Sequence, residues 1–188
     1  MSQRLIDRIV ADETRVPVQT DSPFTYSYFA FLQYFRDLSH IDAQHVIIGA
    51  NFTYGWMPTM LRFKSTQFEQ AASILNQVKQ GEKIGHSDLL FLAHLINNSL
   101  VGVSKLLHFI APTQYAIWDS RVASYLHPKL SHHLLHHTRT YSNYIQTCNE
   151  LIVQPEFVSV HQSINHKIGQ PVTSMRAVEI VMYTKGRG

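Results

Sequence analysis

Hydrophobic residues recur at helical spacing along most of the chain. Between residues 1 and 40 the apolar positions predict two helices, at about 5–10 and 29–38, joined by a proline-containing loop. The same spacing predicts further helices at 68–80, 89–97, 104–110, 120–126, 131–151 and 174–183. The pattern therefore predicts a mainly α-helical fold.

Two stretches do not follow this spacing clearly. Residues 46–52 are apolar enough for either a short helix or a strand, and residues 54–58, with Gly55 and Pro58, predict an aromatic loop. Residues 154–171 are irregular and predict a long loop. Since no repeat, low-complexity tract or interdomain linker interrupts the chain, we expect one compact helical domain over residues 1–188.

Composition narrows the class of protein. Hydrophobic residues make up 45% and charged residues 15% of the 188 residues, which excludes disordered, collagen-like and coiled-coil chains. The single cysteine, Cys148, excludes a disulfide scaffold and a four-thiolate zinc site. No apolar run approaches the ~20 residues that span a bilayer, and the first residues lack a signal-peptide pattern. We therefore expect a cytoplasmic protein without a membrane partner.

Charge gives one weak indication of a partner. Lys plus Arg number 16 against 13 Asp plus Glu, and 12 histidines add positive charge as the pH falls through ~6.5. The surplus is concentrated at residues 105–129, where Asp119 is the only acid, and from residue 167 onward, where Glu179 is the only acid. This distribution is compatible with a polyanion such as DNA.

The most informative stretch surrounds Gly102 and Asp119. Gly102 predicts a tight turn between two helices, Pro112 ends the second helix, and Asp119 begins the next one. Backbone amides of such a turn at a helix N-terminus can hold a phosphate without reading a base. We therefore expect a helix-hairpin-helix-like element at about 89–126. Its predicted DNA contacts are Gly102, Val103, Ser104 and Arg121.

This order resembles the helix-hairpin-helix DNA glycosylases of the HhH-GPD superfamily, in which the hairpin Leu-Pro-Gly-Val-Gly precedes a helix, a loop and an essential aspartate. The similarity covers residues 95–126, and its matching positions are Leu100, Gly102, Val103, Asp119 and Val122. It implies an 8-oxoguanine glycosylase-like fold, a DNA partner and hydrolysis of the N-glycosidic bond of a damaged or modified base. In that family the aspartate stabilises the positive charge that develops on the sugar, which assigns this role to Asp119.

Bifunctional members of the family also carry a lysine just after the hairpin, which forms a Schiff base. Lys105 is the candidate, one position before the family's lysine, and a strict mapping places Leu106 there instead. Val101 and Ser104 stand where the family hairpin has its proline and its second glycine. A lyase step therefore depends on Lys105 acting from a shifted position.

Each of these residues also has a simpler structural interpretation. Asp119 before Ser-Arg-Val is typical of a helix N-cap, and Gly102 is equally typical of a packing position. Lys105 would then be a solvated lysine on an apolar helix, and Arg121 would pair with a carboxylate. The alternative function is a catalytically inert α-helical module that binds nucleic acid or a protein.

Two further clusters carry candidate chemistry. Tyr54 and Trp56 are candidates to stack on a flipped base, although Phe52 and Trp56, four residues apart, are also typical of one buried helix face. Residues 132–137 contain two histidine pairs at i, i+4. On an α-helix this spacing places each pair on one face, where it could bind the metal ion of a metal-dependent hydrolase. Because no third ligand or His-Glu-x-x-His motif accompanies them, we expect neither a metal nor a cofactor.

Overall fold

The computed structural model describes residues 2–20, 22–57, 59–128 and 132–186 and confirms the mainly α-helical fold. The helices of this part of the chain are α1 (Ser2–Glu13), α2 (Pro23–Asp37), α3 (Ala43–Trp56), α4 (Phe68–Lys79), α5 (His86–Leu95), α6 (Leu100–Ile110), α7 (Ser120–Leu126), a 3-10 helix η1 (His132–His136), α8 (Thr138–Ile152), α9 (Phe157–Ile168) and α10 (Ser174–Lys185). None of these helices is long and apolar enough to cross a bilayer.

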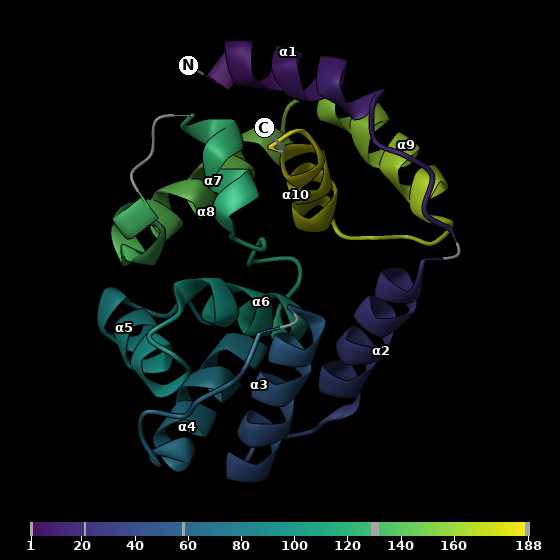
Figure 1. Cartoon of the computed structure of the whole chain (residues 1–188). Coiled ribbons are helices and arrows are strands. Elements are labelled where there is room, and N and C mark those ends of the chain that lie inside the picture. Colours follow the sequence, from purple (N-terminus) through teal and green to yellow (C-terminus); the bar gives the residue numbers. More distant parts are fainter. Residues whose placement is uncertain (1, 21, 58, 129–131, 187–188) are drawn as a thin grey trace.

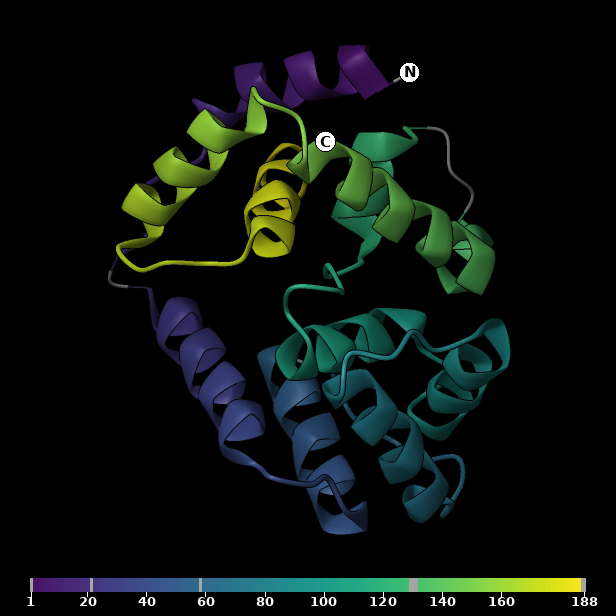
Figure 2. The ribbon, with the colours of Figure 1, turned by 180° about the vertical axis from the view of Figure 1, so that it is seen from behind.

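The helices form two halves around a central waist (Figure 1 and Figure 2). In one half, α6 packs against α2, α3, α4 and α5. In the other half, α10 packs against α7, α8 and α9, and α1 joins them by lying against α9. The first helix therefore belongs with the last four, so the chain leaves one half after α1 and returns to it after α6.

Residues 46–52 are helical, so the strand alternative is wrong. They lie inside α3, which begins at the N-cap Asp42, whose carboxylate accepts the backbone N–H of His45. Val46, Ala50 and Tyr54 follow at intervals of four and are buried on one face. The predicted aromatic loop at 54–58 is also wrong for its first three residues, because α3 continues through Tyr54 to Trp56.

The predicted loop at 154–171 is wrong as well, because most of it forms α9. The buried residues of α9 are Phe157, Val160, Ile164 and Ile168, which recur every three or four positions. The helix ends at Gly169, whose φ of 77° lies in the left-handed region. The stretch looked irregular in sequence, but its apolar stripe at helical spacing decided the structure.

The turn of the hairpin-like element lies upstream of its predicted place. Asn97 and Asn98 form the turn between α5 and α6, with φ values of 60° and 51°. Ser99 caps α6 by accepting the Gly102 N–H at 3.1 Å, so Gly102 lies in the first helical turn. A Cβ on Gly102 would lie 2.9 Å from the ring of Tyr54, so close packing explains this glycine.

The predicted helix at 131–151 is divided into two elements. Residues 132–136 form the 3-10 helix η1, and α8 begins at Thr138. Because a 3-10 helix repeats every three residues, positions four apart do not share a face in η1. Ser131 and the side chains of His132 and His133 lie outside the described part of the chain.

The two halves are joined by residues 111–119, in which a turn at 112–114 is followed by an extended segment at 115–119. This extended segment has neither a helix nor a sheet to satisfy its backbone. Side chains of α6 and α8 bind its polar groups instead, as buried backbone groups require. The bonds run from His108 Nδ1 to Tyr115 O (2.6 Å), from Tyr141 Oη to Ala116 O (3.3 Å), from Tyr144 Oη to Ile117 O (2.9 Å) and from Trp118 N to Ser104 Oγ (3.0 Å).

The close contact between Gly102 and Tyr54 predicts the effect of a methyl group at this position. We expect Gly102→Ala to lower the free energy of unfolding by about 1–3 kcal/mol, because the ring must move within a packed core. Gly55→Ala is the matched control, because Gly55 is exposed in α3 and a Cβ there would meet no atom within 4 Å. Alanine at this position should stabilise the protein by about 0.5–1 kcal/mol. Urea unfolding measures both, and equal stability of Gly102→Ala and the wild type would contradict the packing argument.

Candidate functional site

A cavity of about 650 Å³ lies where the two halves meet. Its walls come from the loop after α1, from α2, from the C-terminal end of α3, from α6, from the extended segment and from α10. Its volume is in the range typical of small-molecule sites. The polar and aromatic side chains that line it include Tyr28, Trp56, Lys105, Asp119, Arg176 and Glu179.

Asp119 is both the N-cap of α7 and a wall of the cavity. Its Oδ1 accepts the backbone N–H groups of Arg121 at 2.9 Å and Val122 at 3.0 Å. The capping interpretation is therefore confirmed, and it leaves Oδ2 without a hydrogen bond to the described residues. One oxygen fixes the carboxylate in place, while the other remains available to a ligand.

Lys105 lies on α6 and is only 6% exposed, so it is not a solvated surface lysine. Burial lowers the pKa of its ammonium group, an effect that the nearby carboxylates of Asp119 and Glu179 oppose. Within the described chain its amine makes neither a hydrogen bond nor an ion pair within 4 Å. Desolvation of this kind makes the neutral, nucleophilic form of the amine easier to reach than in a solvated lysine.

Arg176 and Glu179 form a buried ion pair on α10, in contact with the same cavity. Burial raises the pKa of the Glu179 carboxyl to about 7, even though the Arg176 guanidinium lowers it. The guanidinium also lies over the rings of Tyr28 (4.8 Å) and Trp56 (5.6 Å). The pair thus places one cation and one titrating carboxyl group against an aromatic wall.

The wall is fixed by a buried hydrogen bond between Tyr28 and His108. Since His108 Nδ1 donates to the Tyr115 carbonyl, its Nε2 accepts the Tyr28 hydroxyl proton at 2.9 Å. Burial, with the charge of Arg176, lowers the pKa of His108 to about 3. His108 is therefore neutral at physiological pH and links the cavity wall to the extended segment.

The two predicted stacking residues differ in position. Trp56 lines the cavity and packs edge-on against Phe109 at 5.5 Å. Tyr54 lies in the core at 2% exposure, and its hydroxyl donates to the Ile96 carbonyl. Tyr54 is therefore not placed to stack on a ligand. Phe52 packs inside the protein, stacked on Phe31 with ring centroids 4.9 Å apart.

The predicted phosphate contacts at the start of α6 are used inside the protein. Gly102 donates to Ser99, Val103 is fully buried, and the Ser104 hydroxyl binds the Trp118 backbone. None of these three offers a free group to a phosphate. Arg121 is half-buried over the ring of Tyr183 (4.6 Å), and its Nη1 has no hydrogen-bond partner in the described chain.

Sequence patterns did not assign Tyr28, Arg176 or Glu179 to the site. A signal was present for two of them, because Arg176 and Glu179 are an i, i+3 pair on a helix whose neighbouring residues are mostly apolar. A charged pair within a buried helix indicates a polar site. Tyr28 had no such signal, since an aromatic residue in an aromatic-rich helix is ordinary core composition.

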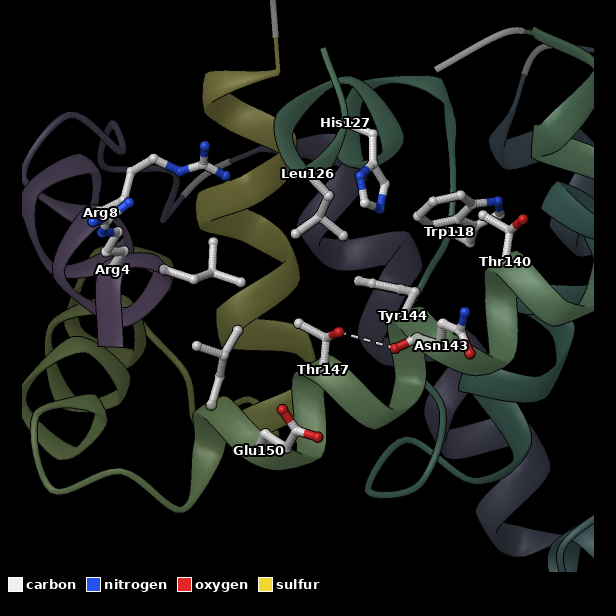
Figure 3. A pocket seen from close by; sticks show the side chains of 12 residues that line it. Arg4, Arg8, Trp118, Leu126, His127, Thr140, Asn143, Tyr144, Thr147 and Glu150 are labelled. Carbon is white, nitrogen blue, oxygen red and sulfur yellow. Dashed lines mark hydrogen bonds between the residues drawn. The ribbon is translucent and has the colours of Figure 1, made fainter. Parts of the chain in front are cut away.

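A second cavity, of about 520 Å³, lies on the other side of the extended segment (Figure 3). Arg4 and Arg8 of α1 line it together with Asn143, Thr147 and Glu150 of α8. Side chains alternate along the extended segment, so Ile117 and Asp119 face the first cavity and Trp118 the second. Arg8 is already engaged, since it donates to the Tyr125 carbonyl and lies over the Tyr125 ring.

Among the described side chains, no three His, Cys, Asp or Glu residues lie close enough to hold a metal ion. Comparison with known proteins finds no family model, curated protein or solved structure that matches the chain. The side chains of the first cavity are therefore the basis on which we infer a function.

Lys105 generates a prediction about stability. Because its pKa is lowered in the folded protein, the unfolded chain binds more protons below the unfolded pKa of ~10.4 and folding is penalised there. We expect Lys105→Met to be more stable than the wild type at pH 7, by about 1.4 kcal/mol for each unit of lowering. The difference should shrink as the pH rises toward ~10.4.

Urea unfolding at several pH values measures this difference. Lys64→Met is the matched control, because Lys64 is exposed and its replacement should change stability little at any pH. A Lys105→Met protein that is less stable at pH 7, or a difference that is independent of pH, would show that Lys105 is not a desolvated amine.

His108 generates a prediction about acid sensitivity. Its pKa of about 3 in the folded protein lies below the usual ~6.5, so its contribution to stability is present above pH ~6.5 and is lost as the pH falls below that value. The loss should be about 1.4 kcal/mol per pH unit. In His108→Gln, whose amide can still donate to Tyr115 and accept from Tyr28, this part of the slope should disappear.

Thermal or urea unfolding between about pH 4 and pH 8 compares the slopes. The exposed His94→Gln variant provides the control, and its slope should match that of the wild type. If His108→Gln also keeps the wild-type slope, His108 is not held neutral by the fold.

Proposed function

We propose that the protein is a DNA glycosylase-like enzyme that hydrolyses the N-glycosidic bond of a damaged or modified base. The observation that carries this proposal is that Lys105 and Asp119 line one cavity, where a desolvated amine and a fixed carboxylate face a shared space. The resemblance to helix-hairpin-helix glycosylases implies the catalytic role of Asp119, and Lys105 is the candidate lysine one position before the family's.

The chemistry of the two side chains suits this reaction. Breaking an N-glycosidic bond leaves positive charge on the sugar, and the Asp119 carboxylate can stabilise that charge in a low-dielectric cavity. Either a water molecule or the Lys105 amine can then bond to C1′ of the sugar. Attack by the amine gives a Schiff base, whereas attack by water gives an abasic site directly.

The walls of the cavity suit a flipped base. Trp56 provides partly exposed aromatic surface beside the buried ring of Tyr28, and the Arg176–Glu179 pair provides a donor and an acceptor. Stacking together with a few hydrogen-bonding groups is the usual means of holding a base outside the duplex. DNA is therefore the proposed partner, although the start of α6 does not supply the phosphate contacts that we expected.

The second candidate function is a catalytically inert helical module that binds nucleic acid or a protein. The observation in its favour is that Asp119 caps α7 with two hydrogen bonds, which is a sufficient structural reason for an aspartate at this position. In this alternative the charged groups of the cavity would bind a ligand without breaking a bond.

Asp119→Asn separates the two functions, because asparagine is as good an N-cap as aspartate but carries no charge. We expect base release to fall roughly 10²-fold or more, while the fold and DNA affinity are retained. The measurement is incubation with duplexes that carry a panel of damaged or modified bases, followed by alkali and sizing of the strands. Borohydride trapping, run in parallel, should give an adduct in the wild type and none in Lys105→Gln if the amine is the nucleophile.

Asp88→Asn is the control, because Asp88 lies in the first turn of α5, where its carboxylate accepts the Gly85 N–H. This variant should release base at the wild-type rate. Alkali-sensitive breaks of equal yield in wild type and Asp119→Asn would contradict the role of Asp119. DNA binding without breaks on any duplex would favour the inert module.

A further inference from the structure

Glu179 is a second carboxyl group in the cavity that contains Asp119. It lies on α10, is only 2% exposed and lines the cavity together with Lys105 and Asp119. A buried carboxyl group is costly, and replacement of a buried ion pair by apolar residues is often neutral or stabilising. The position of Glu179 beside a ligand-sized space therefore points to chemistry rather than to stability.

The charged and titratable groups that interact with Glu179 lie on several elements. They are Arg176 on α10, Lys105 on α6, Asp119 before α7, Tyr28 on α2, and Tyr144 and Cys148 on α8. Burial and the Asp119 carboxylate raise the pKa of Glu179, and Arg176 and Lys105 lower it, with the balance at about 7. At neutral pH the carboxyl group thus carries a proton in a substantial fraction of molecules.

A proton of this kind assists the release of a neutral base. When the bond between C1′ and the base nitrogen breaks, the electron pair remains with the base, so a neutral base leaves as an anion unless it is protonated. Enzymes that break glycosidic bonds commonly divide this work between two carboxyl groups, one protonated acid and one ionised carboxylate, set apart by their surroundings. The surroundings of Glu179 and Asp119 differ here, because Glu179 is almost fully buried beside Arg176, whereas Asp119 is partly exposed and accepts two backbone N–H groups.

We propose that Glu179 is the general acid of the cavity and that the substrates are nucleotides whose base is neutral and needs a proton to leave. This inference rests on the proposed glycosylase function and deepens it. The Glu179 O–H bond breaks and an N–H bond forms on the base as the C1′–N bond breaks. Water then bonds to C1′ and gives its proton to Asp119, and exchange with solvent restores both carboxyl groups.

The Arg176 guanidinium has a positioning role in this scheme. It binds Glu179 on one side and lies over Tyr28 and Trp56 on the other, which fixes the carboxyl group relative to the aromatic wall. A base that lies against this wall is then near the acid. Glutamine at position 179 can still accept a hydrogen bond from Arg176 but cannot transfer a proton, so Glu179→Gln isolates the acid function.

The test compares two leaving groups in the wild type and in Glu179→Gln. One duplex carries the neutral base that the wild type releases, and the other carries a derivative that leaves more easily, 7-methylguanine for a purine or the 5-fluoro derivative for a pyrimidine. We expect Glu179→Gln to slow release of the neutral base roughly 10²-fold or more and to slow release of the better leaving group only a few-fold. The wild-type rate for the neutral base should fall as the pH rises through about 7, and this limb should be absent from Glu179→Gln.

Glu156→Gln is the control, since Glu156 is exposed before α9 and is not among the residues that line the cavity. Thermal unfolding and DNA affinity establish that each variant is folded and binds. An equal loss for both leaving groups would make Glu179 a structural or binding residue, and unchanged rates would show that it takes no part in the reaction. Either result overturns this inference but leaves the proposed function standing. If the wild type releases no base from any duplex, the proposed function fails and the inference fails with it.

Discussion

The backbone of residues 115–118 is the constraint on which the rest of the structure depends. This segment crosses the centre of the protein in an extended form, where buried carbonyl and amide groups cannot remain unpaired. Side chains of α6 and α8 satisfy them, and those side chains are fixed in turn: His108 by Tyr28 and Ser104 by the helix that carries it. The two helical halves are therefore joined through hydrogen bonds to one strand-like segment as well as through apolar contacts.

The cavity follows from that arrangement. Because side chains alternate along an extended segment, Ile117 and Asp119 face one cavity while Trp118 fills the wall of the other. Lys105 lies one position after Ser104 on α6, so the hydroxyl that binds Trp118 and the desolvated amine are neighbours on one helix. The hydrogen bonds that close the core thus also hold the part of α6 that carries Lys105 against the segment that carries Asp119.

Local pattern predicted most helices because their apolar positions recur at intervals of three and four, and it failed where tertiary packing overrode local preference. Residues 46–48 are β-branched or apolar and favour a strand, yet packing of α3 against α4 and α6 makes them helical. Gly102 was predicted as a turn glycine because glycine often marks turns, whereas the turn is formed by Asn97 and Asn98, at the end of the helix predicted over 89–97. Asp119 and Lys105 could be predicted as site residues because the order of hairpin, helix, loop and aspartate resembles a known family. Glu179 lies 60 residues beyond Asp119, and only the fold places it in the same cavity.

Asp119 shows that the structural and the catalytic interpretation of one residue need not compete. The N-cap uses Oδ1 twice, so it fixes the direction of the carboxylate and keeps Oδ2 free of the backbone. A carboxylate that stabilises a developing cation has to be held in place before the charge appears, since reorganisation during the reaction would cost part of the gain. A flexible aspartate in a loop would lack that advantage. The cap is therefore the feature that would make Asp119 effective. It would be evidence against an enzyme only if Oδ2 had no ligand space beside it. Asp119 instead lines a cavity together with Lys105 and Glu179.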